Sequence, residues 1–451
     1  MQLYRFKRGG VHPLHNIHEG KDLAGGKPIE PIAAPNEVAI AMAQGVGAPS
    51  KPVVAVGDAV TVGQLIAEAG GFVGTRIHAS VSGTVTAIME MPTPGGNDAL
   101  HIVIKNDGLD TGRDAFTTAR DTAAMDGKDI LEAIRLAGIG GMGGAGFPTH
   151  VKMSIPEGKK CEYLLINGSE CEPYLTADQR LMEEMSDKIL RGIGYAMRAL
   201  NVSKCKVGVE NNKPKAISAM TAAAKSVSGV EICPLKTKYP QGAEKQLTSA
   251  LTGREVPRGG LPIDCGVVVL NTGTCAAICD AVEYGKPLFE RVVTVTGCVK
   301  EPKNLLCPLG TSFKDAIAYC GGFSEPIAKL ISGGPMMGFA QFTDAVTVAK
   351  GTSGILALND TIANYYDEWP CTHCGKCVAA CPIGIMPLMV DAYIRKGRAD
   401  MAENYNAMDC IECGCCSFIC PSKRHLTQSC RTAKREILAA RAREKNKGGD
   451  K

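Results

Sequence analysis

Two cysteine-rich runs near the carboxyl end constrain the fold of this chain most. The runs "CTHCGKCVAACP", residues 371–382, and "CIECGCCSFICP", residues 410–421, both fit the pattern C-x2-C-x2-C-x3-C-P. In bacterial ferredoxins with this spacing, three cysteines of one run and the fourth cysteine of the other run hold each 4Fe-4S cluster. The spacing therefore predicts two clusters. The predicted ligand sets are Cys371, Cys374, Cys377 and Cys420 for one cluster, and Cys410, Cys413, Cys416 and Cys381 for the other.

The cysteine usage also bears on the alternatives to iron–sulfur clusters. Ten of the twenty cysteines fall between Cys371 and Cys430, and in a chain of 451 residues such clustering indicates metal binding rather than a disulfide framework. Four thiolates can also hold structural zinc, so a non-enzymatic zinc-binding adaptor is an alternative, although zinc sites usually pair two C-x2-C motifs. Cys415 and Cys430 are surplus to the pattern, and packing is their expected role.

The remaining sequence changes character along its length and predicts a multidomain α/β protein. The amino-terminal part predicts short strands and turns, and "VGDAVTVGQLI" followed by "VSGTV" resembles the barrel-sandwich fold of biotinyl and lipoyl carrier domains. No lysine lies between Gly70 and Val85 to carry a prosthetic group. The predicted units are a carrier-like barrel-sandwich domain (1–115), a Rossmann-like α/β domain (116–290), a β-grasp domain (291–355), a helical double-cluster ferredoxin domain (356–435) and a basic tail (436–451).

The α/β and helical assignments follow from alternating segments. Apolar strands alternate with helical segments over 116–290, which predicts a parallel sheet covered on both faces, and residues 177–200 predict one long helix. The insert between the cysteine runs, 383–409, predicts helix, turn, helix, so a helical cluster domain is favoured over the small ferredoxin fold.

Charge and hydropathy limit the partners and the compartment. The net charge is only +4, which argues against capture of nucleic acid by bulk electrostatics. No apolar run is long enough to span a bilayer, and the first residues lack the apolar core of a signal peptide, so we expect a soluble or peripheral intracellular protein. His12, His15 and His18 lie three apart, but without nearby carboxylates or cysteines they predict no metal site.

A glycine-rich segment, "GIGGMGGAGFPTHVK", residues 138–152, has six glycines in its first nine residues. It matches the G-x-G-x-x-G dinucleotide fingerprint through glycine density alone. A helical pattern precedes it where a Rossmann site requires a strand. The stiff Phe147-Pro148 step and the cation Lys152 are unlike a flexible linker. The segment therefore predicts a backbone surface for a flat or phosphorylated ligand.

Acidic and amide residues follow the next buried strand. Asn167, Glu170, Glu172 and Asp178 come just after "EYLLIN", at the edge where ligands gather in α/β sheets. Asp178 is also explained as an acid in the first turn of a helix. Glu170 and Glu172, on either side of Cys171, are explained less well in that way.

Together these motifs resemble a known family. "GGAGFPTHVK", "LLINGSECEP", "YPQGAEKQL" and "LNTGT" occur in the order of the flavin motifs in the NADH-oxidising subunit of complex I and related diaphorases. With the "GGVHP" start, the carrier-like domain and the double-cluster module, the whole chain resembles the C subunits of the Rnf ion-translocating electron-transport complex. The flavin subunit of complex I carries a single cluster in its carboxyl-terminal part, whereas two are predicted here.

The resemblance implies roles for individual residues. Lys152 would pair with a phosphate, and Glu244 matches one of two adjacent glutamates, the other being Ala243 here. Lys152, Glu170 and Glu244 are the implied catalytic residues. The implied cofactor-binding residues are Gly140, Gly141, Gly143, Gly144, Ala145, Gly146 and Phe147 under the flavin and nicotinamide, Lys152 and Asn167 on the flavin, Glu170 and Glu172 on the nucleotide, and Asn271, Thr272 and Thr274 at the ribityl or phosphate end.

The resemblance also implies a function. Such a protein would exchange a hydride between NAD(H) and non-covalent FMN, and would pass single electrons through two 4Fe-4S clusters as part of a ferredoxin:NAD+ oxidoreductase. Its implied partners are other Rnf-type subunits, including integral membrane subunits and a cluster-bearing subunit that accepts electrons from ferredoxin. Its implied place is peripheral, on the cytoplasmic face of the inner or plasma membrane. A soluble NADH diaphorase subunit of a hydrogenase or another oxidoreductase is the alternative within the redox class.

Overall fold

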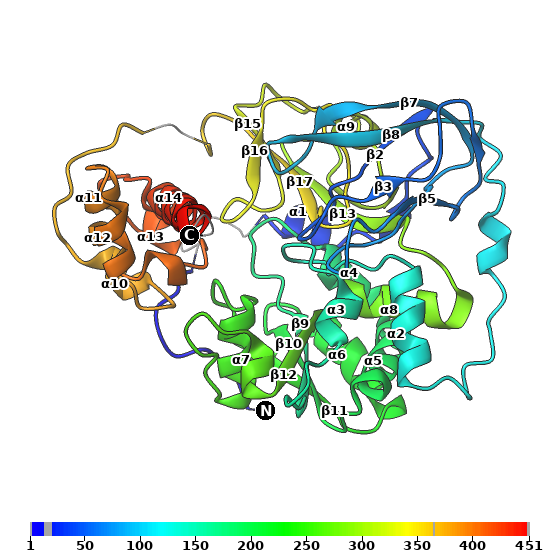
Figure 1. The fold of residues 1–451 in the computed structure, drawn as a ribbon, viewed down its shortest axis with the longest axis horizontal. Helices are drawn as coiled ribbons and strands as arrows, with labels where there is room; N and C mark the ends of the chain where they lie inside the picture. Colours follow the sequence, from blue (N-terminus) through cyan, green and yellow to red (C-terminus); the bar gives the residue numbers. More distant parts are fainter. Residues whose placement is uncertain (1, 13–19, 364–365, 449–451) are drawn as a thin grey trace.

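The computed structural model describes residues 2–12, 20–363 and 366–448, and in Figure 1 the helical cysteine module lies to one side of a larger body built from the α/β domain and two β-rich domains. Of the three amino-terminal histidines, His15 and His18 lie outside the described residues, as do residues 449–451 of the basic tail.

The amino-terminal domain is a barrel sandwich of two small antiparallel sheets, as predicted. Its core is aliphatic; β7 begins with alternating buried and exposed residues, whereas β2 and β8 each bury four consecutive residues. The first sheet has the order β2 (Glu37–Ala41), β8 (Asp98–Asn106), β7 (Gly83–Pro92) and β4 (Ala59–Val60), and the second has the order β3 (Lys51–Pro52), β5 (Leu65–Glu68) and β6 (Ile77–His78).

The central domain contains the predicted parallel sheet with helices on both faces. Along β9, Leu164 and Ile166 point to the helices α5 and α8, whereas Leu165 points to α7 on the opposite face. The strand order is β11 (Val230–Leu235), β10 (Cys205–Glu210), β9 (Tyr163–Gly168) and β12 (Val267–Asn271). The helices are α2 (Gly127–Leu136), α3 (Thr149–Met153), α4 (Ala177–Glu184), α5 (Ser186–Leu200), α6 (Pro214–Ala223), α7 (Glu244–Thr252) and α8 (Thr272–Tyr284).

The long helix predicted over residues 177–200 is wrong, because the segment forms two helices. Met185 leaves the helical conformation between α4 and α5, with φ −127° and ψ 28°. The apolar periodicity continues across the break because both helices bury a stripe in the same core. Both helices contact α6 and α8, and α4 also contacts the strand β13. The break at Met185 therefore lies inside a pattern that looks continuous in sequence.

The β-grasp domain forms a six-stranded sheet that recruits an amino-terminal strand. β1 pairs in parallel with β14, which the sequence did not indicate, and β17 crosses the boundary predicted at residue 355. The strand order is β1 (Ile29–Pro31), β14 (Lys303–Pro308), β13 (Glu290–Gly297), β17 (Gly354–Leu358), β15 (Lys329–Ser332) and β16 (Phe339–Gln341), and the helices are α1 (Asp22–Gly25) and α9 (Phe313–Tyr319).

The cysteine module is helical, as predicted. Asp391, which is 2% exposed, accepts hydrogen bonds from Arg395, Arg424 and Ser429 and so ties three segments of the module together. The helices are α10 (Lys376–Ala380), α11 (Pro387–Ile394), α12 (Ala399–Asn404), α13 (Cys415–Phe418) and α14 (Leu426–Gly448). A short 3-10 turn in the module covers Ala407–Asp409, and others elsewhere in the chain cover Arg113–Phe116, Ala224–Ser226 and Pro262–Cys265.

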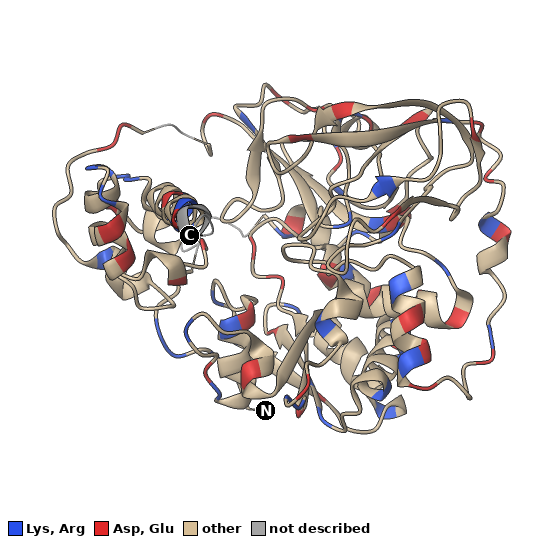
Figure 2. Cartoon of the chain, in the orientation of Figure 1, with Lys and Arg blue, Asp and Glu red and all other residues tan. Residues whose placement is uncertain are grey.

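The basic segment after residue 435 continues α14 without a break, so its described part is a helix rather than a separate tail. Figure 2 shows Lys and Arg interspersed with Asp and Glu over the molecule, in keeping with the small net charge. Among the described residues, no helix is both long enough and apolar enough to cross a bilayer.

Candidate functional site: a glycine loop beside two cysteine-lined cavities

Two asparagines end neighbouring strands of the parallel sheet. Asn167 of β9 is in register with Asn271 of β12. Asn167 Nδ2 donates to the carbonyl of Gly242 over 2.8 Å, and Asn271 Nδ2 donates to Asp178 Oδ2 over 2.7 Å. Asn271 Oδ1 also accepts the backbone N–H of Gly273 and so caps α8. The carboxyl edge of the sheet, where the sequence predicted a ligand, is thus organised by side-chain amides.

The glycine loop is held in a compact turn over this edge. The N–H of Gly141 donates to the carbonyl of Phe147 over 2.8 Å, and the N–H of Met142 donates to Thr274 Oγ1 over 2.9 Å. Gly143 has φ +75°, and a Cβ there would lie 2.7 Å from Asn271 Nδ2, so only glycine fits. Residues 143–145 are exposed, and their backbone is available to a ligand.

Lys152 and Glu244, two of the predicted catalytic residues, contact each other directly. Lys152 Nζ lies 2.5 Å from Glu244 Oε1, and each side chain is about one-third exposed. Lys152 comes from α3, immediately after the glycine loop, and Glu244 is the first residue of α7. A ligand phosphate that binds Lys152 would therefore have to share this ammonium with Glu244.

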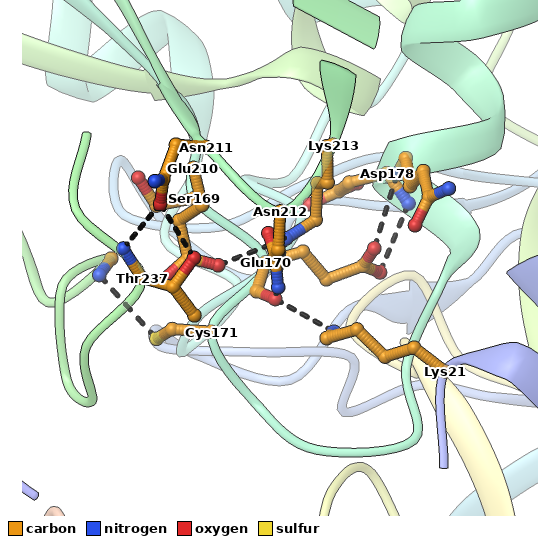
Figure 3. Close-up of polar contacts among 12 residues, drawn as sticks. Lys21, Ser169, Glu170, Cys171, Asp178, Glu210, Asn211, Asn212, Lys213 and Thr237 are labelled. Atoms are coloured by element: carbon orange, nitrogen blue, oxygen red, sulfur yellow. Dashed lines mark hydrogen bonds and ion pairs between the residues drawn. The ribbon is translucent and has the colours of Figure 1, made fainter. Parts of the chain in front are cut away.

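Glu170 caps a helix, as Figure 3 shows. Its carboxylate accepts the backbone N–H groups of Asp178 and Gln179, over 3.0 and 3.1 Å, in the first turn of α4. The carboxyl of Asp178 is buried beside it, and burial followed by repulsion from Glu170 raises the pKa of Asp178 to about 7. Contact between Glu170 and a nucleotide stays a prediction.

Glu172 is fixed by the loop that follows β15. Its two carboxylate oxygens accept the backbone N–H groups of Met336 and Met337, over 3.0 and 2.8 Å, and the hydroxyl of Tyr239 donates to it over 3.4 Å. Burial raises the pKa of Glu172 to about 7, against the lowering effect of these hydrogen bonds. Its predicted nucleotide contact likewise stays a prediction.

Two cations that contact this segment, of which Lys213 is buried and Lys21 partly exposed, were missed by the sequence reasoning. Lys213 forms an ion pair with Glu210 over 2.9 Å, and both side chains are at most 1% exposed (Figure 3). Lys21 Nζ donates to the carbonyls of Glu170, Glu172 and Leu175. Glu210 ends β10 in "VENNK", so its position at a strand end was a usable signal, whereas nothing in the sequence places Lys21 there.

Several buried hydroxyls at the site have no hydrogen-bond partner in the described structure. Ser169 Oγ, Thr272 Oγ1 and Thr149 Oγ1 are all of this kind. Ser169 follows Asn167, Thr272 follows Asn271, and Thr149 ends the glycine loop. Buried polar atoms are nearly always paired, so unpaired hydroxyls close in sequence to the strand ends and the glycine loop fit a ligand rich in hydroxyl and phosphate oxygens, as FMN is.

The eight predicted ligand cysteines line two cavities in the module, and each cavity draws on both sequence runs. The first is lined by Cys371, Cys374, Cys377 and Cys420. The second is lined by Cys410, Cys413, Cys416 and Cys381, with surplus Cys415 also on its wall.

The two cysteine runs adopt similar turns. The N–H of His373 donates to Cys371 Sγ over 3.4 Å, and the N–H of Glu412 donates to Cys410 Sγ over 3.3 Å. Both donors have positive φ. No group of His, Cys, Asp or Glu among the described residues is arranged to hold a single metal ion. The crossed lining fits the predicted ligand sets, which stay a prediction.

Four protein families match successive parts of the chain. The models are the RnfC barrel sandwich hybrid domain over residues 5–109, the Nuo51 FMN-binding domain over 134–280, the SLBB domain over 292–340 and the 4Fe-4S dicluster domain over 363–421. These matches confirm that the α/β domain is of the FMN-binding type and that the cysteine module is of the 4Fe-4S type. The zinc alternative for the cysteine runs is therefore not supported.

Curated relatives match over nearly the full length. The C subunit of the proton-translocating ferredoxin:NAD(+) oxidoreductase complex of Clostridium ljungdahlii is 50% identical, over 98% of this chain and 96% of the relative. The chain belongs to the family of Rnf-complex C subunits. The C subunit of the Na(+)-translocating complex of Acetobacterium woodii is a further relative, 46% identical over 96% of this chain and 97% of that protein.

A solved structure outside the C-subunit family shares the fold. An NAD+-reducing [NiFe]-hydrogenase in the H2-reduced state aligns with a TM-score of 0.50 and 20% identity, over 70% of this chain and 61% of that chain. At this level of sequence identity, the likeness shows a shared fold and nothing more. The curated relatives are C subunits of ion-translocating complexes, which favours that family over a hydrogenase diaphorase.

Proposed function

We propose that this protein is the NAD(H)-reacting subunit of a membrane-bound ferredoxin:NAD+ oxidoreductase complex coupled to ion translocation. The observation that carries the proposal is one chain that holds both an exposed glycine loop at the edge of the parallel sheet and two cavities lined by four or more cysteines. FMN exchanges a hydride with nicotinamide and single electrons with 4Fe-4S clusters, which is the chemistry that joins these two parts.

The chain's own residues would bind and orient the cofactors rather than supply an acid or base. The exposed backbone of residues 143–145 is accessible to a ligand, and Lys152 offers a cation for phosphate. Asn271 and Thr274 hold the loop from below, so its shape is set before a ligand arrives. Under this proposal Glu244 modulates how Lys152 binds phosphate, because the two side chains form a direct ion pair.

The second cavity contacts the α/β domain. Tyr239, which contacts Glu172, packs in one apolar cluster with Cys413 and Cys415 of the second cavity, and Cys171 and Met336 pack against the same cluster. The first cavity includes Cys374, which is exposed. We therefore place the Cys410/413/416/381 set next to the flavin and the Cys371/374/377/420 set toward a partner subunit.

The physiological direction in such a complex would run from reduced ferredoxin, through partner subunits and the two cysteine sites, to NAD+. Integral membrane partners would move the ion. The protein would then sit peripherally on the cytoplasmic face of the membrane, where NAD+ and ferredoxin are found.

The order of the two cluster sites can be tested with the full chain. Anaerobic protein is reduced with dithionite, freed of excess reductant and mixed with NAD+, while electron paramagnetic resonance follows each cluster. In Cys374→Ser, which disrupts the outer set, the remaining inner cluster should be reoxidised by NAD+. In Cys413→Ser, which disrupts the inner set, the outer cluster should stay reduced. The opposite pattern would reverse the order.

Placement in a membrane complex is tested by co-purification. The protein, tagged at its chromosomal locus, should bring down hydrophobic subunits after mild detergent extraction. A stable assembly with soluble partners alone would instead support the diaphorase alternative.

A further inference from the structure

The barrel-sandwich domain touches the glycine loop directly, at the end that leads into Phe147. The N–H of Val46 donates to the carbonyl of Ala145 over 3.1 Å. A Cβ at Gly45 would overlap the carbonyl oxygen of Gly146, and a Cβ at Gly146 would lie 2.8 Å from the Cα of Gly45. The two backbones are thus in contact with no side chain between them, in the segment that connects β2 to β3.

The other end of the glycine loop is fixed to the same domain by a buried lysine. Lys350, which is 1% exposed, comes from the residues between β16 and β17. Its Nζ donates to the carbonyl of Gly138 over 2.7 Å and to the carbonyl of Arg76 over 2.6 Å. Its backbone N–H donates to Gln44 Oε1 over 2.9 Å. One side chain therefore connects the start of the loop, the barrel-sandwich domain and the β-grasp domain.

The barrel residues that Lys350 contacts belong to the link between β5 and β6. Thr75 Oγ1 lies 3.4 Å from Lys350 Nζ, and a Cβ at Gly138 would overlap the carbonyl oxygen of Arg76. This link lies in the part of the barrel that lacks the prosthetic lysine of a carrier domain. Here the same region supports a loop of the neighbouring domain.

Glycine-rich loops lose much conformational entropy when they are ordered, and Gly138, Gly143 and Gly146 all have positive φ. A ligand that had to order such a loop would bind more weakly than one that meets it already ordered. The barrel-side contacts hold Gly138 at one end of the loop and Ala145 and Gly146 at the other, whereas residues 143 and 144 between them stay exposed.

We infer that the barrel-sandwich domain is a structural part of the flavin site, in which the Gln44–Val46 segment and Lys350 hold the glycine loop ready for FMN. This inference rests on the proposed function, because it takes FMN as the ligand of the loop. Gly45, Val46 and Lys350 are positioning residues, since each acts through the loop backbone. None of them lies within the region matched by the FMN-binding domain.

The test compares two Gly→Ala variants of the full chain in the same domain. In Gly45→Ala the new methyl group collides with the backbone of Gly146. In Gly71→Ala it meets only the Cβ of Ala48 at 3.8 Å, and neither glycine has positive φ. FMN is removed, and its rebinding is measured by quenching of FMN fluorescence. Iron content and the thermal midpoint of the flavin-free protein are recorded for each variant.

Gly45→Ala should weaken FMN binding by about tenfold or more, with iron content unchanged, and Gly71→Ala should bind as the wild type does. NADH-dependent dye reduction by Gly45→Ala should recover when FMN is added in excess, which a merely unstable protein would not do. Lys350→Met is the second test, in case the structure accommodates the new methyl group of Gly45→Ala without moving the loop. It should also weaken FMN binding with iron content unchanged, whereas Lys314→Met, at an exposed position, should bind FMN as the wild type does.

The outcomes separate this inference from the proposed function. Wild-type FMN affinity in both Gly45→Ala and Lys350→Met would overturn the role of the barrel-sandwich domain while leaving the flavin site in place. Failure of the wild-type protein to bind FMN would instead overturn the proposed function on which the inference depends.

Discussion

At the scale of single residues, the site is built from charged groups whose partners lie within the protein. Lys152 pairs with Glu244, Lys213 pairs with Glu210, and Glu172 accepts two backbone N–H groups. Only the first pair is substantially exposed and open to a ligand. The buried groups therefore shape the segment that carries the site, and the exposed pair is the one expected to respond to phosphate.

Removing the exposed cation should impair nucleotide chemistry selectively. Lys152→Met is expected to lower NADH-dependent dye reduction by about tenfold or more, since a charge-assisted contact to phosphate contributes roughly 1.5–3 kcal/mol. Lys159→Met breaks a comparable pair with Asp264 on the surface of the same domain and should have no such effect. Iron content should equal that of the wild type in both. Equal activity of the two variants would show that Lys152 does not contact the substrate or cofactor.

The raised pKa of Glu172 predicts a pH-dependent stability difference. Its folded-state pKa of about 7 exceeds its ordinary value of 4.5, so the folded protein binds this proton more tightly than the unfolded chain does. The resulting stability is present at low pH and is lost as pH rises through about 7. Glutamine cannot ionise. As the pH is raised from acidic to mildly alkaline, calorimetry should therefore show the thermal midpoint of Glu172→Gln rising relative to that of the wild type.

The matched control for this prediction is Glu255→Gln at an exposed position of the same domain. Its midpoint should follow that of the wild type at every pH. A constant offset between Glu172→Gln and the wild type would mean that the pKa of Glu172 is the same in the folded and the unfolded protein, and so is not raised by folding.

At the scale of elements, one asparagine serves both a helix and the glycine loop. Asn271 caps α8 through the N–H of Gly273, and Gly143 packs against its amide. The cap is predictable from "LNTGT", because Asn followed by an apolar helical segment is a start signal. The contact with Gly143 is not, since it depends on how the loop folds back over the sheet.

A cap substitution separates these two roles. Asn271→Ala should cost about 1 kcal/mol of stability through loss of the cap, and should also weaken FMN binding because the loop loses its support. Ser312 caps α9 by accepting the N–H of Asp315, far from the loop in sequence and in another domain. Ser312→Ala should therefore lose a similar stability with FMN affinity intact, as judged by fluorescence titration. Equal FMN affinity in the two variants would contradict the assigned role of Asn271.

Much of the element-level structure was predictable, and the exceptions have physical causes. Strands such as β9 and β12 are short apolar runs with clear ends, and the pattern of the cysteine insert indicated α11 and α12. The break at Met185 was hidden because α4 and α5 bury stripes in the same core. Strand β1 is only three residues long and pairs with β14, more than 270 residues later, so no local pattern identifies it.

The candidate site shows the same division between local and long-range information. Gly143, Asn167 and Asn271 were predicted from motifs, and the structure brings them together at the sheet edge. Lys21 and Lys350 were missed because a lysine in a loop normally faces water, whereas these two are directed by tertiary contacts onto backbone carbonyls.

At the scale of the whole molecule, the domains form a sequence of contacts that suits electron transfer. The barrel-sandwich domain contacts the glycine loop, and the α/β domain contacts the cavity lined by Cys413. In Figure 1 the cysteine module extends to one side of the body, and the exposed Cys374 belongs to its other cavity. The central claim is therefore that NAD(H), FMN and two clusters are joined in one path within this chain.

That claim is tested most directly by counting the electrons that the fully reduced protein delivers to NAD+. Anaerobically purified protein with its FMN, iron and acid-labile sulfide quantified is reduced, freed of reductant and mixed with excess NAD+. One FMN and two clusters hold four electrons, so the account predicts that NADH formation approaches about two per chain as both cluster signals disappear. Protein with its full complement of cofactors that forms no NADH, or whose clusters stay reduced, would contradict it.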